Sequence, residues 1–509
     1  MTVLETLHYN SARGRWVITA TVLGSGIAAL DATVVNIALP TIGKEFEVGL
    51  GSLQWVVNGY TLTLAGLLLL GGSLGDRFGR RRIFLIGVTW FALASLLCAV
   101  SPNAPFLISA RLLQGVGGAL LTPASLAILQ ASFAPGDRSK AIGAWSGLGG
   151  VAVAIGPFIG GYLIHSLSWR LIFFINLPLA VTVLAVTLRY VPETRDPGAS
   201  RRIDVPGAVL AAMGLAGVTY GLTYGPDVGW TSTWVALTLG VGILLLLAFV
   251  AVELRIRAPL LPMSMFRSAQ FSATNLVTFT VYGALGAMLF LLPLHLQQVA
   301  GFSPIAAGTA LLPVTILMLL FSSRSGDLAA RIGPRLQMST GPLVVAVGMA
   351  LLFRIGQSGN YLTEVLPPVL VIGAGLAITV APLTSTALSS APMEHAGIAS
   401  AVNNDVARVA GLFAVAVLPP LAGLTAGSYL DPNAFARGFR IAILIAAATC
   451  ALGGLLAVAL IRNPTLPTLQ AGQVDHAEPH EHAMRHCALD SPPATIDGHS
   501  AAEAAAGST

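Results

Sequence analysis

Two side chains of opposite charge stand inside apolar stretches of the sequence. Asp31 lies in IAALDATVVNIALP and Arg111 in RLLQGVGGAL. A charge at the centre of a lipid bilayer costs a few kcal/mol or more, so such groups face a bundle interior or a cavity and find a partner. At about 1.5 Å per helical residue, both fall at similar depths. A carboxylate whose proton affinity depends on whether water, a ligand or an arginine lies beside it can carry a proton. We therefore expect Asp31 to face a water-accessible cavity, where its charge can be switched.

The same residues also fit a purely structural role, because Asp31 and Arg111 can form a fixed salt bridge that only holds helices together. A second pair leaves a similar choice open. Asp405 lies three residues before Arg408, within reach on a helix, and is either a second protonation site or the counter-charge of Arg408. The residues that we predict to couple to protons are Asp31, Arg111, Asp405 and Arg408.

Polar and small residues gather on one face of two predicted helices. On the helices 105 to 130 and 397 to 420 they recur at spacings of three or four, which places them on a common face. We expect these faces to line a substrate cavity, with Gln114, Gly118, Thr122, Ser125 and Asn404 as its residues. His295, near the end of another predicted helix, fits either a titratable ligand contact or a satisfied interfacial histidine.

The elements that position these residues must be membrane-spanning helices. Of 509 residues, 55% are hydrophobic and only 10% are charged, too few to cover a soluble surface. Stretches of about 20 mostly apolar residues, each long enough to span a bilayer, recur along the chain. We predict fourteen spans, at 16 to 39, 52 to 73, 83 to 101, 105 to 130, 140 to 164, 169 to 189, 204 to 225, 232 to 253, 269 to 298, 303 to 322, 337 to 355, 362 to 388, 397 to 420 and 439 to 461.

Charge placement predicts the orientation. With the N-terminus in the cytoplasm, 20 of the 27 basic residues fall in cytoplasmic segments, so both termini should be cytoplasmic. This bias accounts for the net charge of +5 and leaves little to suggest nucleic-acid binding. The first span lacks a signal-peptide cleavage site and should remain in the mature protein. Cys98 and Cys450 lie in spans and Cys487 in the tail, so no pair is placed for an extracellular disulfide.

An internal repeat divides the chain. GSLGDRFGRRR at 72 to 82 resembles GDLAARIGPR at 326 to 335, and each copy follows the second span of a six-span set. A duplicated bundle around a midplane site is typical of transporters. The fold class is therefore an all-α integral membrane protein of about 14 transmembrane helices, two six-helix bundles plus two inserted helices. We place these parts at 1–190 (N-terminal bundle), 191–268 (inserted helices with cytoplasmic linkers), 269–462 (C-terminal bundle) and 463–509 (disordered cytoplasmic tail).

The first loop resembles the loop motif of the major facilitator superfamily position by position. Its matching residues are Gly72, Leu74, Asp76, Arg77, Gly79, Arg80, Arg81 and Leu85. Further motifs follow in the order seen in the fourteen-span drug/proton antiporter branch: LDATVVNIALP, RLLQGVGGAL, GPFIGG, WRLIFFINLP, LPLHLQQVAGFSPIAAGTALLP and NNDVARVAG. The resemblance covers roughly residues 16 to 462. It departs at Ala152, where the family often has glycine, and at Ala330, opposite Asp76.

The resemblance implies roles for two motifs. The loop, with Gly72, Asp76, Arg77, Gly79, Arg80 and Arg81, should gate the transporter. Asp76 should approach residues 391 to 397, where a helix N-terminus favours an anion; the alternative makes the arginines topology anchors only. The glycine motif should allow close helix packing and comprises Gly156, Pro157, Gly160 and Gly161, and we expect Pro157 to kink the helix there.

The resemblance implies a proton-driven secondary active exporter of amphipathic drugs or antibiotics, working by alternating access across the plasma (inner) membrane. The alternative is a dedicated exporter of one endogenous metabolite, such as an antibiotic, siderophore or lipid precursor, with the same fold and coupling. Expected partners are small amphipathic substrates, protons and membrane lipid, and a monomer can suffice. No catalytic constellation, nucleotide-binding domain or metal-ligand spacing stands in the spans, so we expect neither enzyme activity nor a cofactor or metal, and the proton gradient as energy source. The tail histidines, without a folded scaffold, are not expected to bind metal.

Overall fold

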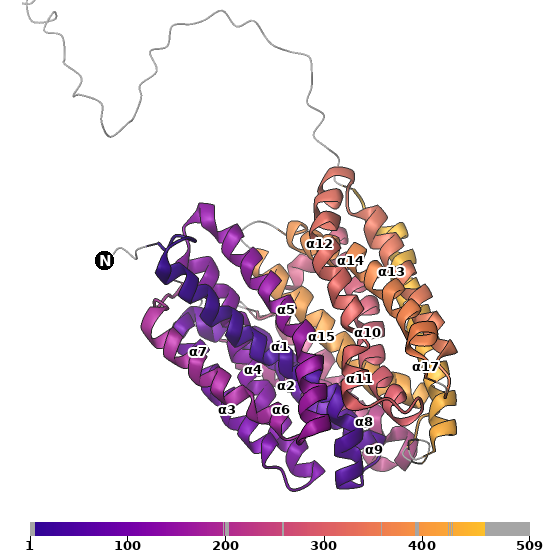
Figure 1. The fold of residues 1–509 in the computed structure, drawn as a ribbon. Helices are drawn as coiled ribbons and strands as arrows, with labels where there is room; N and C mark the ends of the chain where they lie inside the picture. The colour runs from indigo at the N-terminus through magenta and orange to yellow at the C-terminus, as the bar shows by residue number, and fades with distance from the viewer. Residues whose placement is uncertain are drawn as a thin grey trace, which may run out of the picture. The chain divides into compact units, whose positions relative to one another are not determined.

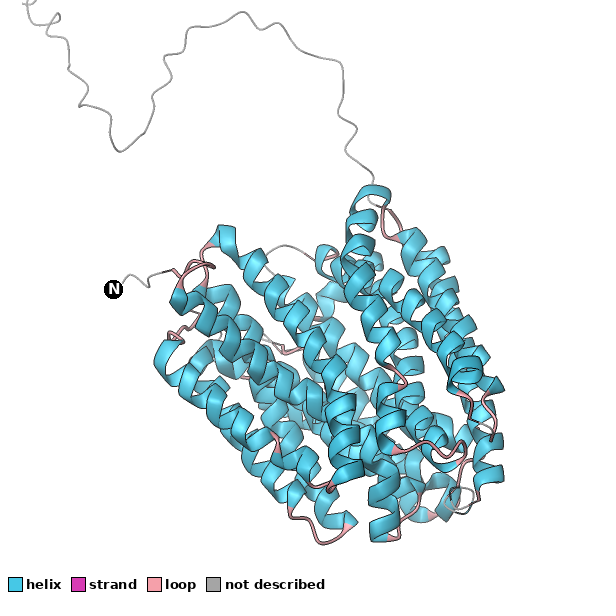
Figure 2. Ribbon diagram, in the orientation of Figure 1, coloured by secondary structure: helices cyan, strands magenta, loops and turns pink. Residues whose placement is uncertain are grey.

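The computed structural model describes residues 6–196, 198, 203–256, 259–357, 359–391, 396–425, 427, 429 and 431–463. All of the described residues lie within one compact unit of the chain, residues 1–463. In the described part of the chain, every regular element is a helix, as Figure 2 shows. The predicted tail, apart from Asn463, lies outside the described residues.

The helices follow one another along the chain with short connections. The first group is α1 (Ala12–Phe46), α2 (Leu50–Phe78), α3 (Arg80–Ala99), α4 (Ala104–Ser132), α5 (Pro135–Ser166), α6 (Leu171–Phe174) and α7 (Asn176–Tyr190). Then come α8 (Val205–Val228), α9 (Thr233–Glu253) and the short turn η1 (Met263–Arg267). The last group is α10 (Ala269–Gln298), α11 (Pro304–Thr309), α12 (Leu312–Ile332), α13 (Arg335–Leu351), η2 (Leu352–Arg354), η3 (Tyr361–Val365), α14 (Leu366–Ser389), α15 (Ala396–Leu421) and α17 (Pro432–Leu460).

Length and apolar composition confirm a multi-pass helical membrane protein. Among the described residues, 13 helical segments are long and apolar enough to cross a membrane. The remaining predicted span, 140 to 164, is α5, a helix of 32 residues. The predicted class, all-α with about fourteen spans, is therefore confirmed.

Several helices extend beyond the predicted spans. α1 begins at Ala12 rather than at residue 16, and it continues through Pro40 to Phe46. A proline removes one helical hydrogen bond, but neighbouring helices can hold the segment across that point. The apolar pattern marks only the part of a helix that lies in lipid, so polar helix ends escape it.

Successive helices alternate in direction because short loops join them. We call the side where α1 begins and α17 ends the terminal face, and the side where α1 ends and α17 begins the opposite face. The N-terminal segment is consistent with this alternation, since the N–H of Leu7 donates to the carbonyl of Ser132 at 2.8 Å. The start of α1 and the end of α4 therefore share the terminal face.

The α1–α7 and α10–α17 groups meet near the opposite face. Gln297 Nε2, at the end of α10, donates to the Ile37 carbonyl of α1 at 3.0 Å. Gly161 of α5 lies so close to α11 that a Cβ would come within 2.7 Å of Ile305 Cα. Figure 1 shows α11 beside α1 and α5. A continuous apolar core includes residues of both groups in this region.

The space between the groups widens toward the terminal face. Gly143 precedes Gly161 by about five turns of α5, so the two residues lie on the same side of the helix. A Cβ on Gly161 would meet α11, whereas nothing lies within 4 Å of a Cβ on Gly143. Gly147, one turn further on, likewise has nothing within 4 Å. The described conformation is therefore closed at the opposite face and more open at the terminal face.

The α8–α9 hairpin packs against α2 and α15. Its helices approach closely, since a Cβ on Gly242 would lie 2.6 Å from the Val218 nitrogen. Leu215 of α8 lies in an apolar cluster with Leu62 of α2 and Leu412 of α15. The hairpin thus contacts both groups of helices.

Candidate functional site

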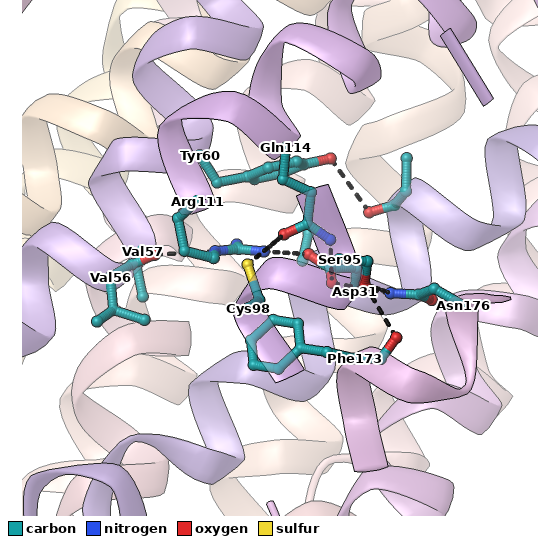
Figure 3. Close-up of polar contacts among 12 residues, drawn as sticks. Asp31, Val56, Val57, Tyr60, Ser95, Cys98, Arg111, Gln114, Phe173 and Asn176 are labelled. Atoms are coloured by element: carbon teal, nitrogen blue, oxygen red, sulfur yellow. Dashed lines mark hydrogen bonds and ion pairs between the residues drawn. The ribbon is translucent and has the colours of Figure 1, made fainter. Parts of the chain in front are cut away.

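The carboxylate of Asp31 lies in a network of polar side chains, drawn in Figure 3. Arg111 Nη1 forms an ion pair with Asp31 Oδ2. Gln114 Nε2 donates to Asp31 Oδ1 at 2.9 Å, and Asn176 Nδ2 donates to the same oxygen at 3.2 Å. Arg111 Nη1 also donates to Gln114 Oε1 at 2.6 Å. Donors from α4 and α7 therefore satisfy both carboxylate oxygens.

Helix α2 holds the guanidinium of Arg111 on two further sides. Arg111 Nε donates to the Val56 carbonyl at 3.0 Å. Arg111 Cζ lies over the Tyr60 ring, 4.4 Å from the ring centroid, which allows a cation–π contact. Tyr60 Oη donates to the Ala28 carbonyl of α1 at 3.4 Å. The arginine therefore retains polar and aromatic partners that do not depend on the Asp31 charge.

A second row of contacts positions the amide of Asn176. Asn176 Nδ2 donates to Ser95 Oγ at 2.9 Å, and Ser95 Oγ donates to the Phe173 carbonyl at 2.9 Å. Cys98 Sγ donates to Gln114 Oε1 at 3.5 Å. The network thus joins α1, α3, α4 and the α6–α7 span, and a buried network of this kind orients each of its members.

The network is shut off from water in this conformation. Asp31 and Arg111 are each 1% exposed, and Gln114 and Asn176 are fully buried. The sequence predicted a water-accessible cavity beside Asp31, but the carboxylate faces α4 and α7 inside the first group of helices. Burial strengthens the attraction within the pair and also raises the cost of leaving either charge alone. Neutralising Asp31 would therefore change the balance of the whole network.

Glycines bring α2 and α4 close enough to build this arrangement. A Cβ on Gly115 would lie 2.0 Å from Thr63 Oγ1 and 2.3 Å from the Tyr60 carbonyl. Gly118 also packs directly on the Tyr60 side chain. The close approach lets the arginine of α4 reach the Val56 carbonyl of α2.

The other predicted cavity residues of α4 are more enclosed than expected. Gln114 belongs to the Asp31 network, and Gly118 lies in the contact with α2. Ser125 is fully buried and donates to the Leu121 carbonyl at 3.0 Å. Thr122 is half-buried, and its Oγ1 has no hydrogen-bond partner. Most of the α4 face that carries these residues packs against neighbouring helices, so their role in a substrate cavity stays a prediction.

The second predicted pair, Asp405 and Arg408, lies on α15. In the described part of the chain, no ion pair links Asp405 to Arg408, and neither Asp405 Oδ1 nor Arg408 Nε has a hydrogen-bond partner. Asn404 is exposed and donates only to the Ser400 carbonyl, at 3.1 Å. The choice between a second protonation site and a counter-charge of Arg408 therefore stays a prediction. The neighbouring Asn403 is buried and donates to Thr278 Oγ1 of α10 at 2.8 Å.

Asp76 is held by its own loop and by the segment after α7. Its Oδ1 accepts from Arg80 Nε at 2.9 Å, and its carbonyl accepts from the Asp196 N–H at 3.0 Å. Arg77 is exposed at the terminal face, and Gly72 packs on α4. The predicted approach of Asp76 to residues 391–397 stays a prediction, because residues 392–395 lie outside the described part.

The segment after α7 caps the helix that follows this loop. The Glu193 carboxylate accepts from the N–H groups of Arg81 and Arg82, both at 3.1 Å, and so satisfies the start of α3. Gly79 precedes α3 with φ +114°, and a Cβ there would lie 2.6 Å from the Glu193 carboxylate. Arg81 Nη2 reaches back to the Leu188 carbonyl at 2.7 Å.

The second copy of the repeat has the same construction. Asn463, after α17, accepts from the Arg335 N–H at the start of α13 at 3.0 Å. Gly333 precedes α13 with φ +86°, and a Cβ there would meet the Asn463 side chain at 2.2 Å. Arg335 Nη2 donates to the Val458 carbonyl of α17 at 2.6 Å. The repeated glycine and arginine thus have equivalent contacts in both copies.

These caps give a stability prediction. Replacing Glu193 or Asn463 by alanine should each lower the unfolding free energy by about 1 kcal/mol, because each change removes the acceptor at a helix start. Thermal unfolding of the purified variants in detergent measures the effect. Glu47→Ala, at an exposed acid on the opposite face, serves as the control. Wild-type unfolding temperatures for both cap variants would contradict this role.

The glycine motif of α5 faces two helices. A Cβ on Gly160 would lie 2.3 Å from Val34 Cγ1 of α1, and one on Gly156 would lie 2.7 Å from a second side chain of α1. Gly161 faces α11, and the Pro157 carbonyl also abuts α11. The motif therefore lies where α5 bridges α1 and the second group of helices.

His295 is enclosed within the second group. It is fully buried, and its ring stacks on Phe439 with centroids 4.0 Å apart. His295 Nε2 lies 3.4 Å from the Ile355 carbonyl. These contacts favour the structural interpretation of this histidine over a ligand contact.

Sequence reasoning missed several members of the sites. Asn176 stood in the quoted motif WRLIFFINLP, where one amide interrupts an apolar run, and that signal could have identified it. Tyr60 and Ser95 gave no comparable signal, because aromatic and hydroxyl residues are common in spans. The caps by Glu193 and Asn463 depend on contacts between distant segments and could not be read from local sequence.

A duplicated helical bundle with a buried acid–base network is the architecture of a secondary membrane transporter. The chain belongs to the Major Facilitator Superfamily, whose profile matches residues 21–415. The puromycin resistance protein pur8 of Streptomyces alboniger is 36% identical and covers 88% of this chain and 92% of its own length. The multidrug resistance protein Stp of Mycobacterium tuberculosis is 34% identical and covers 81% of this chain and 77% of its own length.

Solved structures show the same fold. A bacterial homolog of the human lysosomal transporter Spinster, in an inward-facing and unoccupied conformation, matches 90% of this chain and 100% of that chain with a TM-score of 0.64 and 16% identity. The predicted family and the major facilitator fold are therefore confirmed.

Proposed function

We propose that this protein exports amphipathic drugs or antibiotics across the plasma membrane and is driven by the proton gradient. The observation that carries the proposal is the Asp31 network, in which a titratable carboxylate is buried against Arg111 on helices that also contact the second group. Both relatives described above are named as resistance proteins, which supports export of toxic compounds. The gradient supplies the energy, so no cofactor is required.

The conformation of the helices indicates one state of the transport cycle. We assign the terminal face to the cytoplasm because the N-terminus lies there, and the sequence predicts a cytoplasmic N-terminus from the 20 of 27 basic residues that fall in the segments expected to be cytoplasmic. The closed opposite face and the wider terminal face then correspond to an inward-facing state. Substrate would enter from the cytoplasm or the inner leaflet and contact Thr122 and Asn404, which keep unpartnered or exposed polar groups.

Proton exchange at Asp31 would couple the two states of the transporter. While Asp31 is ionised, Arg111 holds it and the network is satisfied. Protonation from the outside removes the charge attraction, releases substrate outward and biases the return to the inward-facing state. The Val56 carbonyl and the Tyr60 ring would hold Arg111 in place while Asp31 is protonated. Loss of the proton to the cytoplasm would re-form the ion pair.

Asp405 and Arg408 are a second candidate site for coupling. Asp405 Oδ1 and Arg408 Nε lack hydrogen-bond partners in this conformation, so a substrate, a proton or the other transport state can supply them. The gating role of the Asp76 loop and the division into two bundles, an insert and a tail also remain proposals. The matching caps in the two repeats support that division. A monomer contains every element that this cycle needs.

A dedicated exporter of one endogenous metabolite is the second candidate. It is favoured by the relative named for resistance to a single antibiotic, puromycin. The fold and the Asp31 network serve both functions equally. The two candidates differ in how many compounds drive transport.

A vesicle assay separates them. Inverted membrane vesicles containing the protein are acidified inside, and dyes and antibiotics are added one at a time while the internal pH is recorded. A proton-driven exporter dissipates the gradient when a substrate is added. A response to many unrelated compounds supports multidrug export, and a response to one chemical family supports the dedicated exporter. If no compound in a broad panel, including metabolite extracts, moves protons, the proposal of proton-coupled export is wrong.

A further inference from the structure

Two buried carboxyl groups meet at the terminal-face end of the α8–α9 hairpin. Asp204 precedes α8 and is 2% exposed, and Glu253 ends α9 and is 3% exposed. A Cβ on Gly207 would lie 2.3 Å from Asp204 Oδ2 and 2.9 Å from Glu253 Oε1, so the two oxygens flank one point. The acids come from different helices and lie outside the Asp31 network.

The other oxygen of each acid is already used. Asp204 Oδ1 accepts from the Gly207 N–H at 2.8 Å and caps α8. Glu253 Oε2 accepts from the Leu261 N–H at 3.0 Å. The facing oxygens, Asp204 Oδ2 and Glu253 Oε1, have no donor partner as long as both groups are ionised. Two ionised carboxylates accept hydrogen bonds only, so a proton between them supplies the missing donor and removes one buried charge.

No cation among the described residues neutralises these two acids in place of a proton. Arg255 and Arg267 of the linker after α9 are exposed and form no ion pair with either acid. Asp76 of α2 is paired with Arg80, and Asp405 and Arg408 lie further along α15, beyond its first turns. Within α2, α15 and the described residues of the linker after α9, the charged groups are Asp76, Arg77, Arg255, Arg267, Asp405 and Arg408.

The pair is connected to the second group of helices. Leu261, which Glu253 holds through its N–H, packs on an apolar cluster that contains Met265 of the linker, Phe271 of α10 and Ala399 of α15. A change at the carboxyl pair therefore reaches the terminal-face ends of α10 and α15.

We propose that Asp204 and Glu253 together bind one proton, and that this shared proton fastens the α8–α9 hairpin to the linker that leads into α10. Loss of the proton leaves two like charges buried side by side, which repel each other and separate. Glu253 then turns toward water and releases the Leu261 N–H. Because the fastened state holds the proton, it is favoured at low pH and is lost as the pH rises. The terminal-face end of the second group thereby responds to the pH on that side of the membrane.

The full-length protein in lipid nanodiscs, without substrate or gradient, tests this proposal apart from the transport function. Hydrogen–deuterium exchange of the linker peptide containing Leu261 is followed from about pH 5 to about pH 9 and corrected for the intrinsic pH dependence of exchange. In wild type, the corrected exchange rate should rise about tenfold or more with pH. In Glu253→Gln it should stay slow, because the amide donates to Asp204 while its oxygen still accepts from Leu261.

Three further measurements keep the test decisive. Asp204→Asn retains the cap of α8 and should also abolish the pH dependence. Glu47→Gln, at an exposed acid on the opposite face, should behave as wild type. The infrared absorption of a protonated carboxyl should include a component that is lost in both Asp204→Asn and Glu253→Gln. Linker exchange without pH dependence in wild type, or an unchanged pH dependence in both pair variants, would overturn the proposal.

Discussion

Replacing Asp31 by asparagine should abolish proton-driven uphill transport while leaving substrate exchange across the membrane. The asparagine has nearly the same shape, and Gln114 and Asn176 remain to hydrogen-bond it. Arg111 keeps its contacts with the Val56 carbonyl and the Tyr60 ring. The variant should therefore fold and resemble the protonated state, but it cannot release a proton. We expect drug accumulation against a gradient to fall to background, about a hundredfold or more below wild type.

Two assays on the same proteoliposomes measure this effect. Counterflow of labelled substrate reports binding and conformational exchange, and accumulation driven by an imposed pH gradient reports coupling. Asp31→Glu is the matched control because it keeps a titratable carboxyl, and it should retain part of the uphill transport. Full uphill transport by Asp31→Asn would mean that the pair only holds helices together and that coupling occurs elsewhere, with Asp405 as the next candidate.

Removing the partner charge should have the largest effect on stability. Arg111→Ala leaves the buried Asp31 without its cation, and breaking a buried pair in this way costs about 3–5 kcal/mol. The double variant Asp31→Asn, Arg111→Ala leaves no isolated charge and should recover a large part of that loss. Unfolding of the single and double variants in detergent gives the coupling between the two residues.

An exposed pair provides the comparison. Arg170 Nη1 lies 2.5 Å from Glu45 Oε1 at the opposite face, and the two side chains are 30% and 41% exposed. Arg170→Ala should cost about 1 kcal/mol or less, because solvent screens exposed pairs. Equal losses for Arg111→Ala and Arg170→Ala, or losses that simply add in the double variant at Asp31 and Arg111, would contradict a tightly coupled buried pair.

The depth of the Asp31 pair could be predicted from the sequence because depth follows from counting residues along a helix. The direction in which Asp31 points could not, since a span that is apolar on all sides gives no amphipathic signal to orient it. The sequence therefore led to an open cavity beside Asp31, whereas the carboxylate lies inside the first group of helices. Asn176 reaches it only because α7 packs against α1, a contact that local sequence does not encode.

The two repeat loops also contain contacts that could not be predicted from the sequence. The repeated glycine and arginine identified the duplication, and the positive φ angles of Gly79 and Gly333 explain why glycine recurs there. Glu193 and Asn463, which cap the two following helices, differ in residue type and follow the last helix of their group. A comparison of sequence copies cannot align them, because equivalent geometry is built here from unlike side chains.

Substrate-induced proton release from the purified protein tests the central claim most directly. In weakly buffered detergent solution near neutral pH, with a pH-sensitive dye, a substrate found in the vesicle assay is added to wild type and to Asp31→Asn. If substrate and proton compete through Asp31, wild type should release protons in proportion to the bound substrate, and the variant should bind substrate without any release. Equal release from both proteins would contradict the assignment of Asp31 as the coupling group.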